Sequence, residues 1–322
     1  MEHPSSLSET TAAARRVIAA VERVIAGNAA AVEAAVICLL AEGNLLLEGV
    51  PGVGKTMLAR AVARSIGGSF RRIQATPDLL PSDLTGVSVY DQERRQFTFT
   101  AGPVFANVVL VDEINRTSPR TQSALLEPME ERQVTVEGVA RPLPAPFFLV
   151  ATENPVEHHG TYPLPEGQLD RFTMAAQVTY PSGADEREVV TRQLLRHPID
   201  DLQSVLSPEE VAHHQHAVRA VHVAEAIVDY AVAVIGATRW HPHAVLGASP
   251  RSAVALTRCA QARAAVHGRS YVLPDDVKAL SVPVLGHRVL TGQGRSAART
   301  GRDLVAEVLE QVPVPIGVAE SV

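Results

Sequence analysis

Residues 45–56 read Leu45-Leu46-Leu47-Glu48-Gly49-Val50-Pro51-Gly52-Val53-Gly54-Lys55-Thr56, and they indicate more about the fold than any other part of the sequence. The leucines predict a short buried strand, and the apolar spacing over 57–66 predicts a helix directly after the glycine-rich turn. Glycines in such a turn let backbone N–H groups surround phosphate oxygens, and the start of the following helix favours negative charge. The complete pattern between a strand and a helix therefore predicts a phosphate-binding loop.

The loop also carries the two side chains that binding of a nucleoside triphosphate requires. We expect Lys55 to reach the β- and γ-phosphates and the Thr56 hydroxyl to bind Mg²⁺. ATP and Mg²⁺ are therefore the predicted cofactors. The predicted nucleotide-binding residues of the loop are Gly49, Val50, Pro51, Gly52, Val53, Gly54, Lys55, Thr56 and Met57.

Two further apolar runs end in polar side chains. The run 108–111 leads into Asp112 and Glu113, and the run 147–152 is followed by Asn154. Because the carboxyl ends of parallel strands meet at one edge of a sheet, these side chains should lie beside the phosphates. Asp112 is expected to hold Mg²⁺, and Glu113 to orient or deprotonate the attacking water. Asn154 is expected to hydrogen-bond the water or the γ-phosphate.

The first half of the chain alternates strands with helices. The predicted strands are 45–47, 70–75, 108–111, 147–152 and 177–180. Unbroken apolar strands of this kind predict an α/β fold with a parallel five-stranded sheet and helices on both faces. Two alternating runs, 87–90 and 96–100, predict a hairpin between the second and third strands. One helix is predicted near 120–132, bent at Pro128 because proline lacks the backbone N–H.

The second half reads as helical. Ser207, with Glu210 three positions later, is typical of a helix start, and Ser249 and Pro274 begin two more predicted helices. We therefore divide the chain into a disordered N-terminus over 1–11, a nucleotide-binding α/β domain over 12–182 and a smaller all-α lid domain over 183–322.

Composition and charge narrow the class of protein. The 322 residues are 46% hydrophobic and 20% charged, with a net charge of −6. This balance argues against a surface devoted to nucleic acid, because neutralising phosphates needs clustered Lys and Arg. The chain has no basic and apolar leader, and its longest apolar runs are too short to span a bilayer, so we expect a cytoplasmic protein without membrane insertion. Cys38 and Cys259 are expected to be buried and reduced.

Several longer strings are specific enough to indicate a family. Residues 47–52 read LEGVPG, residues 81–86 read PSDLTG and residues 102–105 read GPVF. The stretch 112–134 contains DEINR and MEERQV, and the stretch 161–172 contains TYPLPE and LDRF. These strings resemble the MoxR family of AAA+ ATPases, and the resemblance covers roughly the whole chain from the first predicted helix onward.

The resemblance implies roles that spacing alone does not assign. Asn154 would be the sensor-1 residue, Arg171 the arginine finger for the γ-phosphate of a neighbouring subunit, and Arg251 the sensor-2 arginine of the lid. A fixed guanidinium suits a finger because it spreads the charge of the transition state. The resemblance also implies a homo-hexamer and a chaperone-like motor. Its partner protein would carry a von Willebrand factor A domain.

Alternatives remain for the arginines and for the function. Arg171 could instead form a salt bridge with Asp170 or Glu166, and Arg116 is a rival for the role in a neighbouring subunit. Arg251 could be a plain exposed arginine in the first turn of a helix. The alternative functions are an ATPase subunit of a chelatase-like metal-insertion complex, a nucleic-acid motor with the basic pair 94–95 in its hairpin, and a regulatory nucleotide-binding module without turnover.

Overall fold

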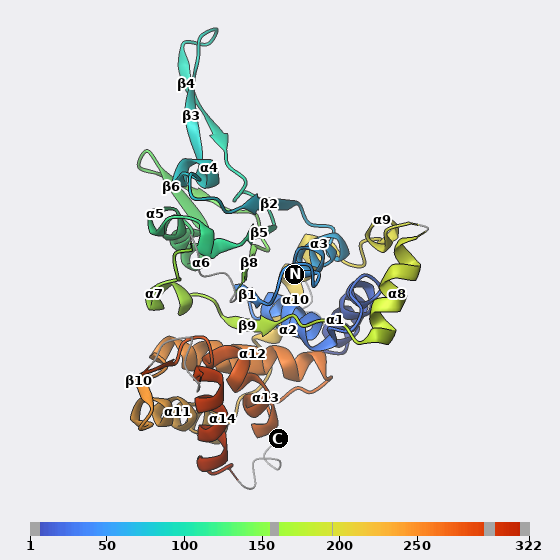
Figure 1. Cartoon of the computed structure of the whole chain (residues 1–322), viewed down its shortest axis with the longest axis vertical. Coiled ribbons are helices and arrows are strands. Elements are labelled where there is room, and N and C mark those ends of the chain that lie inside the picture. Colours follow the sequence, from blue (N-terminus) through green and yellow to red (C-terminus); the bar gives the residue numbers. More distant parts are fainter. Residues whose placement is uncertain (1–6, 155–160, 195, 293–299, 316–322) are drawn as a thin grey trace.

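The structure is a computed structural model that describes residues 7–154, 161–194, 196–292 and 300–315. Its centre is a five-stranded sheet (Figure 1). In spatial order the strands are β2 (Phe70–Gln74), β5 (Val108–Asp112), β8 (Phe148–Glu153), β1 (Leu45–Glu48) and β9 (Met174–Gln177). All neighbouring strands pair in parallel, which confirms the predicted parallel five-stranded sheet.

Two hydrophobic clusters cover the two faces of this sheet. Leu45 and Leu47 of β1 belong to one cluster, together with residues of the helices α1 (Leu7–Glu22), α2 (Ala29–Leu40) and α3 (Lys55–Ser65). Leu46 belongs to the other, together with residues of the short helices α4 (Pro81–Thr85), α6 (Leu126–Glu131) and α7 (Glu166–Leu169). The alternation follows from the two-residue period of a strand, and it confirms helices on both faces.

Two predicted boundaries are wrong by a few residues. Helix α1 begins at Leu7, so residues 7–11 are helical rather than disordered, while residues 1–6 lie outside the described residues. Strand β9 covers Met174–Gln177 rather than 177–180 and pairs residue by residue with β1. Its alanines have a weak preference for strands, so pairing with β1 rather than local preference determines where this strand lies.

The connection between β5 and β8 also differs from the prediction. After a 3-10 turn, η1 (Ile114–Arg116), the expected single helix is divided into α5 (Pro119–Ser123) and α6. Pro128 has no N–H to donate to the carbonyl of Ala124, so the helix is interrupted where that bond would form. A second hairpin, β6 (Gln133–Val136) with β7 (Val139–Pro142), follows and was not predicted.

The predicted hairpin between β2 and β5 is present and projects from the sheet as an arm (Figure 1). It consists of β3 (Gly86–Asp91) and β4 (Gln96–Ala101), paired antiparallel. On one side of the arm, the guanidinium of Arg141 lies 3.9 Å from the ring centroid of Phe99. Tyr90 and Phe97 are exposed, so the arm also presents aromatic rings to solvent.

The chain after residue 182 is mostly helical. Ser182 and Ser207 cap α8 (Gly183–Gln193) and α10 (Pro208–Val218). The other helices are α9 (Pro198–Asp201), α11 (Glu225–Trp240), α12 (Pro250–Val266), α13 (Pro274–Leu285) and α14 (Gly301–Gln311). The lid is not purely helical, because β10 (Ala244–Leu246) and β11 (Leu290–Thr291) form a small antiparallel pair. This pair joins the loop before α12 to the loop after α13.

The lid helices pack directly on the nucleotide-binding half of the chain. Helix α12 contacts α1 and α2, and α13 contacts the edge strand β9 (Figure 1). A single hydrophobic cluster contains residues of α1, α2 and α3 as well as residues of α11 to α14. The lid is therefore joined to the sheet by continuous apolar packing along one of its faces and at β9.

Candidate ATP-binding and hydrolysis site

The predicted phosphate-binding loop joins β1 to α3. A Cβ at Gly49 would lie 2.3 Å from the carbonyl oxygen of Val178, so only glycine fits there. Gly52 and Gly54 have φ values of 85° and 96°, a region that residues with a Cβ disfavour. Within the described part of the chain, no atom lies within 4 Å of a Cβ at Gly52, so the turn is open on that side. The other loop residues are an exposed Pro51, a half-buried Val50 and a buried Val53.

Lys55, Thr56 and Met57 form the first turn of α3, at the end of the helix that favours anions. The buried ammonium group of Lys55 donates to the carbonyl oxygen of Gly49 and, at 3.2 Å, to that of Glu153. Met57 packs against the hydrophobic cluster of the sheet. These carbonyl oxygens are neutral acceptors, which the charged oxygens of a phosphate can replace.

Asp112 ends β5 inside a network of hydrogen bonds. Its Oδ2 accepts from the Thr56 hydroxyl at 3.1 Å and from Arg72 at 2.6 Å, and its Oδ1 accepts from the Thr152 hydroxyl at 2.6 Å. Burial alone would raise the pKa of the Asp112 carboxyl, but the bonds from Thr152, Arg72 and Thr56 outweigh burial and hold this pKa below its usual range. The carboxylate is therefore ionised at neutral pH. Together with the Thr56 hydroxyl it provides the oxygen ligands that Mg²⁺ prefers.

Glu113 follows Asp112 in the left-handed region, with a φ of 59°. Its N–H donates to the Thr152 hydroxyl oxygen at 2.8 Å, so Thr152 joins both acids of the pair. Its Oε2 accepts from the Gln74 amide at 3.0 Å and lies 3.2 Å from Nε of Arg116. Arg116, the rival candidate for a role in a neighbouring subunit, is therefore bound to the acid of its own chain.

A cavity of about 770 Å³ opens beside the loop, and the buried side chain of Asn154 lines it together with Gly49. Thr179 forms part of the same wall. The Asn28 side chain fixes this wall, because it accepts from the Thr179 N–H at 3.0 Å and donates to the Thr179 carbonyl at 3.2 Å. The structure therefore brings Asn154 and the phosphate-binding loop to one cavity.

Residues of the lid also line this cavity. Arg302 of α14 lines it and donates to Oε2 of Glu48 at 2.6 Å. Glu48 is the last residue of β1 and directly precedes the loop. The ion pair therefore ties the lid to the base of the phosphate-binding loop.

Three residues that form hydrogen bonds with Asp112 or Glu113 were not predicted from the sequence. They are Arg72 and Gln74 of β2 and Thr152 of β8. The register of the sheet places Gln74 opposite Asp112. One signal was present, because Arg72 and Gln74 alternate with a buried Ile73 and so share one face of their strand. The sequence did not indicate that β2 would be the strand next to β5.

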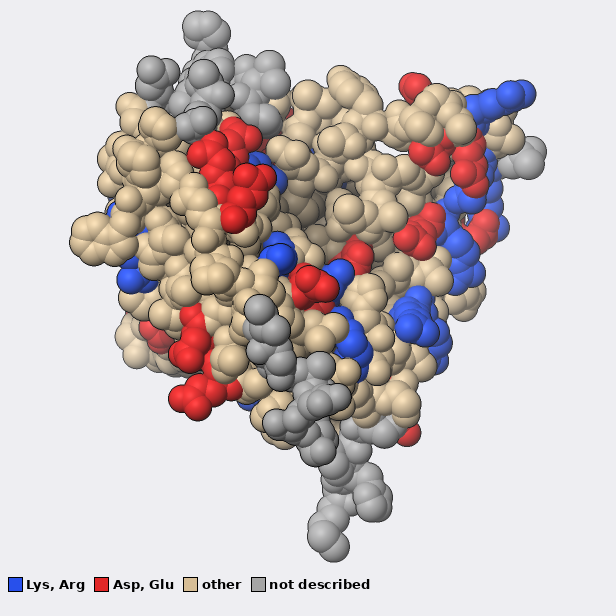
Figure 2. Space-filling model, turned by 90° about the horizontal axis from the view of Figure 1, so that it is seen from below, with Lys and Arg blue, Asp and Glu red and all other residues tan. Residues whose placement is uncertain are grey.

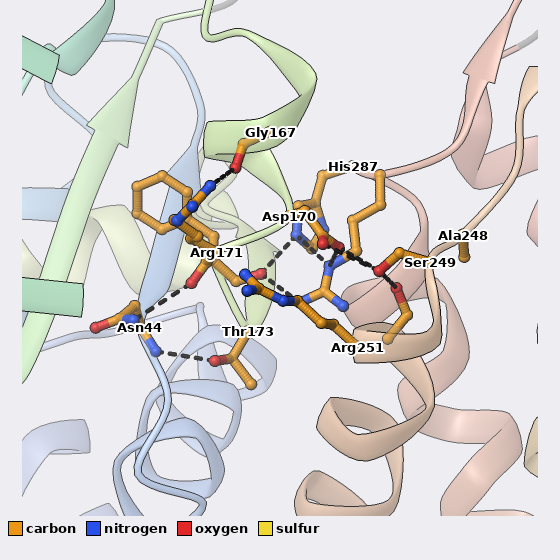
Figure 3. A network of polar contacts seen from close by, with 12 residues as sticks. Asn44, Gly167, Asp170, Arg171, Thr173, Ala248, Ser249, Arg251 and His287 are labelled. Carbon is orange, nitrogen blue, oxygen red and sulfur yellow. Dashed lines mark hydrogen bonds and ion pairs between the residues drawn. The ribbon is translucent and has the colours of Figure 1, made fainter. Parts of the chain in front are cut away.

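Arg171 and Arg251 lie away from the loop. Asn44, which directly precedes β1, donates to the Arg171 carbonyl at 3.3 Å, whereas the loop directly follows β1. Arg171 therefore lies at the opposite edge of the sheet. Arg251, in the first turn of α12, extends toward it (Figure 3). Glu130 binds both guanidinium groups, so the acidic partner of Arg171 is neither of the two acids weighed from the sequence.

The fold and this site define a class of protein. A phosphate-binding loop after an interior parallel strand, an Asp-Glu pair two strands away and a helical lid are the parts of an AAA+ ATPase. Comparison of the sequence with models of known protein families gives the same class. The family model described as "ATPase family associated with various cellular activities (AAA)" matches residues 44–174, and the model described as "AAA lid domain" matches residues 236–310.

Whole-length relatives define the family. The chain is 48% identical to the uncharacterised protein YeaC of Bacillus subtilis, over 92% of this chain and 93% of that protein. It is 42% identical to "Chaperone MoxR1" of Mycobacterium tuberculosis, over 93% of this chain and 82% of that protein. The crystal structure of a presumed ATPase from Cytophaga hutchinsonii is 36% identical, with a TM-score of 0.88 over 96% of this chain and 97% of that one. The chain belongs to the MoxR family of AAA+ ATPases and is an ATP-hydrolysing enzyme. Among the described residues, none of the helices combines the length and the apolar character that a membrane span requires.

Proposed function

We propose that this chain is a magnesium-dependent AAA+ motor that works as a homo-hexamer in the cytoplasm and remodels or matures partner proteins. The observation that carries the proposal is the separation of the two halves of the active site. The phosphate-binding loop and the acids Asp112 and Glu113 lie at the carboxyl edge of the sheet, whereas Arg171 and Arg251 lie at the amino edge. A γ-phosphate at the first edge would therefore receive its arginines from a second copy of the chain.

The residues at the carboxyl edge have distinct roles in the proposed reaction. Lys55 exchanges the two carbonyl oxygens that it now binds for phosphate oxygens. Thr56 and Asp112 hold Mg²⁺, which neutralises phosphate charge when it is bound. Glu113 orients or deprotonates the attacking water, and Asn154 hydrogen-bonds the water or the γ-phosphate.

The partner is proposed to be a protein with a von Willebrand factor A domain, by resemblance to the family. The name of one relative, "Chaperone MoxR1", supports a chaperone-like role. The arm offers a surface of suitable chemistry, because Tyr90 and Phe97 are exposed at 49% and 71%. A purified domain of this kind is expected to raise the ATPase rate. A rate that stays the same would remove this partner and leave the motor in place.

A motor for nucleic acid is less well supported. At the lid end, Lys and Arg are mixed with Asp and Glu over the described part of the surface, with no continuous basic field (Figure 2). In the arm, Arg94 lies 3.8 Å from a carboxylate oxygen of Asp91. Strong DNA binding that weakens steeply with salt would reverse this preference.

The experiment that tests the shared site is the ATPase rate per subunit against protein concentration. We expect the rate to rise with concentration, because each site needs a neighbour. When the Arg171→Ala variant is mixed into wild type, the ATPase rate should fall by more than the dilution of wild-type subunits alone would cause. Arg196→Ala is the matched control, since this arginine is 66% exposed and pairs with Asp201 away from the site. A rate that is independent of concentration and insensitive to Arg171→Ala would refute the shared site.

A further inference from the structure

One carboxylate binds both arginines of the amino edge. Glu130 lies on α6, and its Oε1 is 3.2 Å from Nε of Arg171. The same oxygen accepts a hydrogen bond from Nη1 of Arg251. Arg171 belongs to the sheet domain and Arg251 to the lid, so Glu130 joins two cations that lie far apart in the sequence.

The backbones that carry the two arginines are fixed to each other independently of Glu130. Asp170, next to Arg171, accepts from the Ser249 hydroxyl at 3.0 Å with both of its carboxylate oxygens (Figure 3). Ser249 is the cap of α12, two positions before Arg251. Nη1 of Arg171 also donates to the Gly167 carbonyl oxygen (Figure 3). Loss of Glu130 would therefore release the end of Arg251, leave Arg171 with its bond to Gly167 alone, and leave the attachment points of both side chains in place.

The two arginines border a cavity of about 550 Å³ that suits an anion. Five arginines line it, which are Arg132, Arg171, Arg251, Arg258 and Arg288, against three carboxylates. None of the residues that line this cavity lines the cavity beside the phosphate-binding loop. The excess of guanidinium groups fits a ligand with several negative charges, such as a triphosphate.

We infer that Glu130 is a competing counterion, which holds Arg171 and Arg251 in the separate chain and gives them up to the triphosphate carried by a second copy. This inference rests on the shared site of the proposed function. The Nη1–H of Arg251 that donates to the carboxylate cannot bind phosphate at the same time, and the ion pair holds the guanidinium of Arg171 beside Glu130. Each arginine must therefore exchange Glu130 for a phosphate oxygen before it can serve a neighbour, and the exchange opposes assembly of the complete site.

Glu130 is a positioning residue, so its effect should fall on assembly rather than on the plateau rate. Glu130→Gln keeps the size of the side chain and removes its charge. We expect the protein concentration at half-maximal ATPase rate to fall by about three- to tenfold. This fold-change corresponds to the summed free energies of two partly exposed ion pairs. The plateau rate per subunit should stay within about twofold, and the affinity of the dilute chain for ADP should not change, because Glu130 is remote from the loop.

Glu131→Gln is the matched control, since this neighbouring acid lies on the same helix and contacts Gln133 rather than an arginine. It should behave as wild type. Glu130→Asp keeps the charge and should stay closer to wild type than Glu130→Gln. Combined with Arg171→Ala and Arg251→Ala, Glu130→Gln should have no further effect on assembly.

The outcomes separate this inference from the proposed function. A half-maximal concentration that is unchanged or raised in Glu130→Gln, while wild type still depends on concentration, overturns the inference alone. A lower plateau rate with a lower unfolding midpoint assigns Glu130 a purely structural role and also overturns it. A wild-type rate that is independent of concentration overturns both the inference and the shared site.

Discussion

Thr152 offers the sharpest test of the hydrolysis site. Its hydroxyl donates to Oδ1 of Asp112 at 2.6 Å and accepts from the N–H of Glu113 at 2.8 Å, and the side chain is fully buried. Thr152→Val keeps the shape and removes both bonds. The acid that we assign to Mg²⁺ and the acid that we assign to water would then lose their common anchor.

The size of the effect follows from the two bonds. A hydrogen bond to a charged group contributes about 1.5–3 kcal/mol, and a buried N–H without a partner costs about 1–3 kcal/mol. We expect Thr152→Val to lower the free energy of unfolding by about 2.5–6 kcal/mol, the sum of these two contributions. If about 1.5–3 kcal/mol is also lost in the transition state, kcat falls roughly tenfold to a hundredfold.

The pH dependence adds a second, independent readout. The Thr152 hydroxyl is one of the bonds that hold the pKa of Asp112 below its usual range, against the opposite effect of burial. Removing this bond raises the pKa, so the acid limb of the kcat profile should move to higher pH.

Steady-state ATPase assays at saturating protein and urea unfolding measure the two effects. Thr152→Ser is the control, because it keeps the hydroxyl and loses only a methyl group, and we expect its kcat within about threefold of wild type. A valine variant that matches the serine variant in kcat, stability and pH profile would show that Thr152 does not anchor the two acids.

Three further variants test separate parts of the molecule. Lys55→Ala should abolish ATP binding, and a fluorescent-nucleotide titration that still shows wild-type affinity would contradict the assigned loop. Glu113→Gln should bind ATP and hydrolyse it at least about a hundredfold more slowly; turnover at the wild-type rate would move the role to another residue. Asp276→Asn should lower the free energy of unfolding by about 3 kcal/mol at pH 7, because it breaks a buried pair with Arg263 and Arg269. Burial alone would raise the pKa of Asp276, but the hydrogen bond from Arg269 and the other hydrogen bonds to this carboxylate hold its pKa below the usual range. The carboxylate therefore stabilises the fold only while it is ionised, and the loss of stability in Asp276→Asn should shrink as pH falls below about 4. Equal urea midpoints at pH 7 would refute this reasoning.

Much of the fold could be predicted because the residues that favour a strand or helix locally are also the ones that are buried in the folded protein. The leucines of β1 and the valines of β5 are buried on both faces of the sheet, so an apolar run was sufficient to find each strand. The edge strand β9 was misplaced because its alanines look helical or neutral, and only pairing with β1 makes them a strand. The division of the helix after β5 depended on one missing hydrogen bond, which proline indicates but does not locate.

The residues of the candidate site also fall into two groups, those that were predicted from the sequence and those that were not. Residues that belong to one continuous motif, such as Lys55 and Thr56, were found from the sequence because chain connectivity alone places them together. Arg72 and Thr152 were missed because they reach Asp112 from two different neighbouring strands, which depends on strand order. The contact of Arg251 with Glu130 depends on how the lid packs, and no local pattern encodes it.

The placement of the loop and the two arginines at opposite edges of one sheet also has a consequence for symmetry. If the arginines serve a neighbour, each contact between copies joins two unlike faces and therefore has a direction. A two-fold dimer would set loop against loop or arginine against arginine. In an open row of copies, the copy at one end has a phosphate-binding loop that receives no arginines from a neighbour. Each copy added to the row creates one more complete site. Only closure of the row completes the last site, so closure itself becomes a step at which activity can be gained or lost.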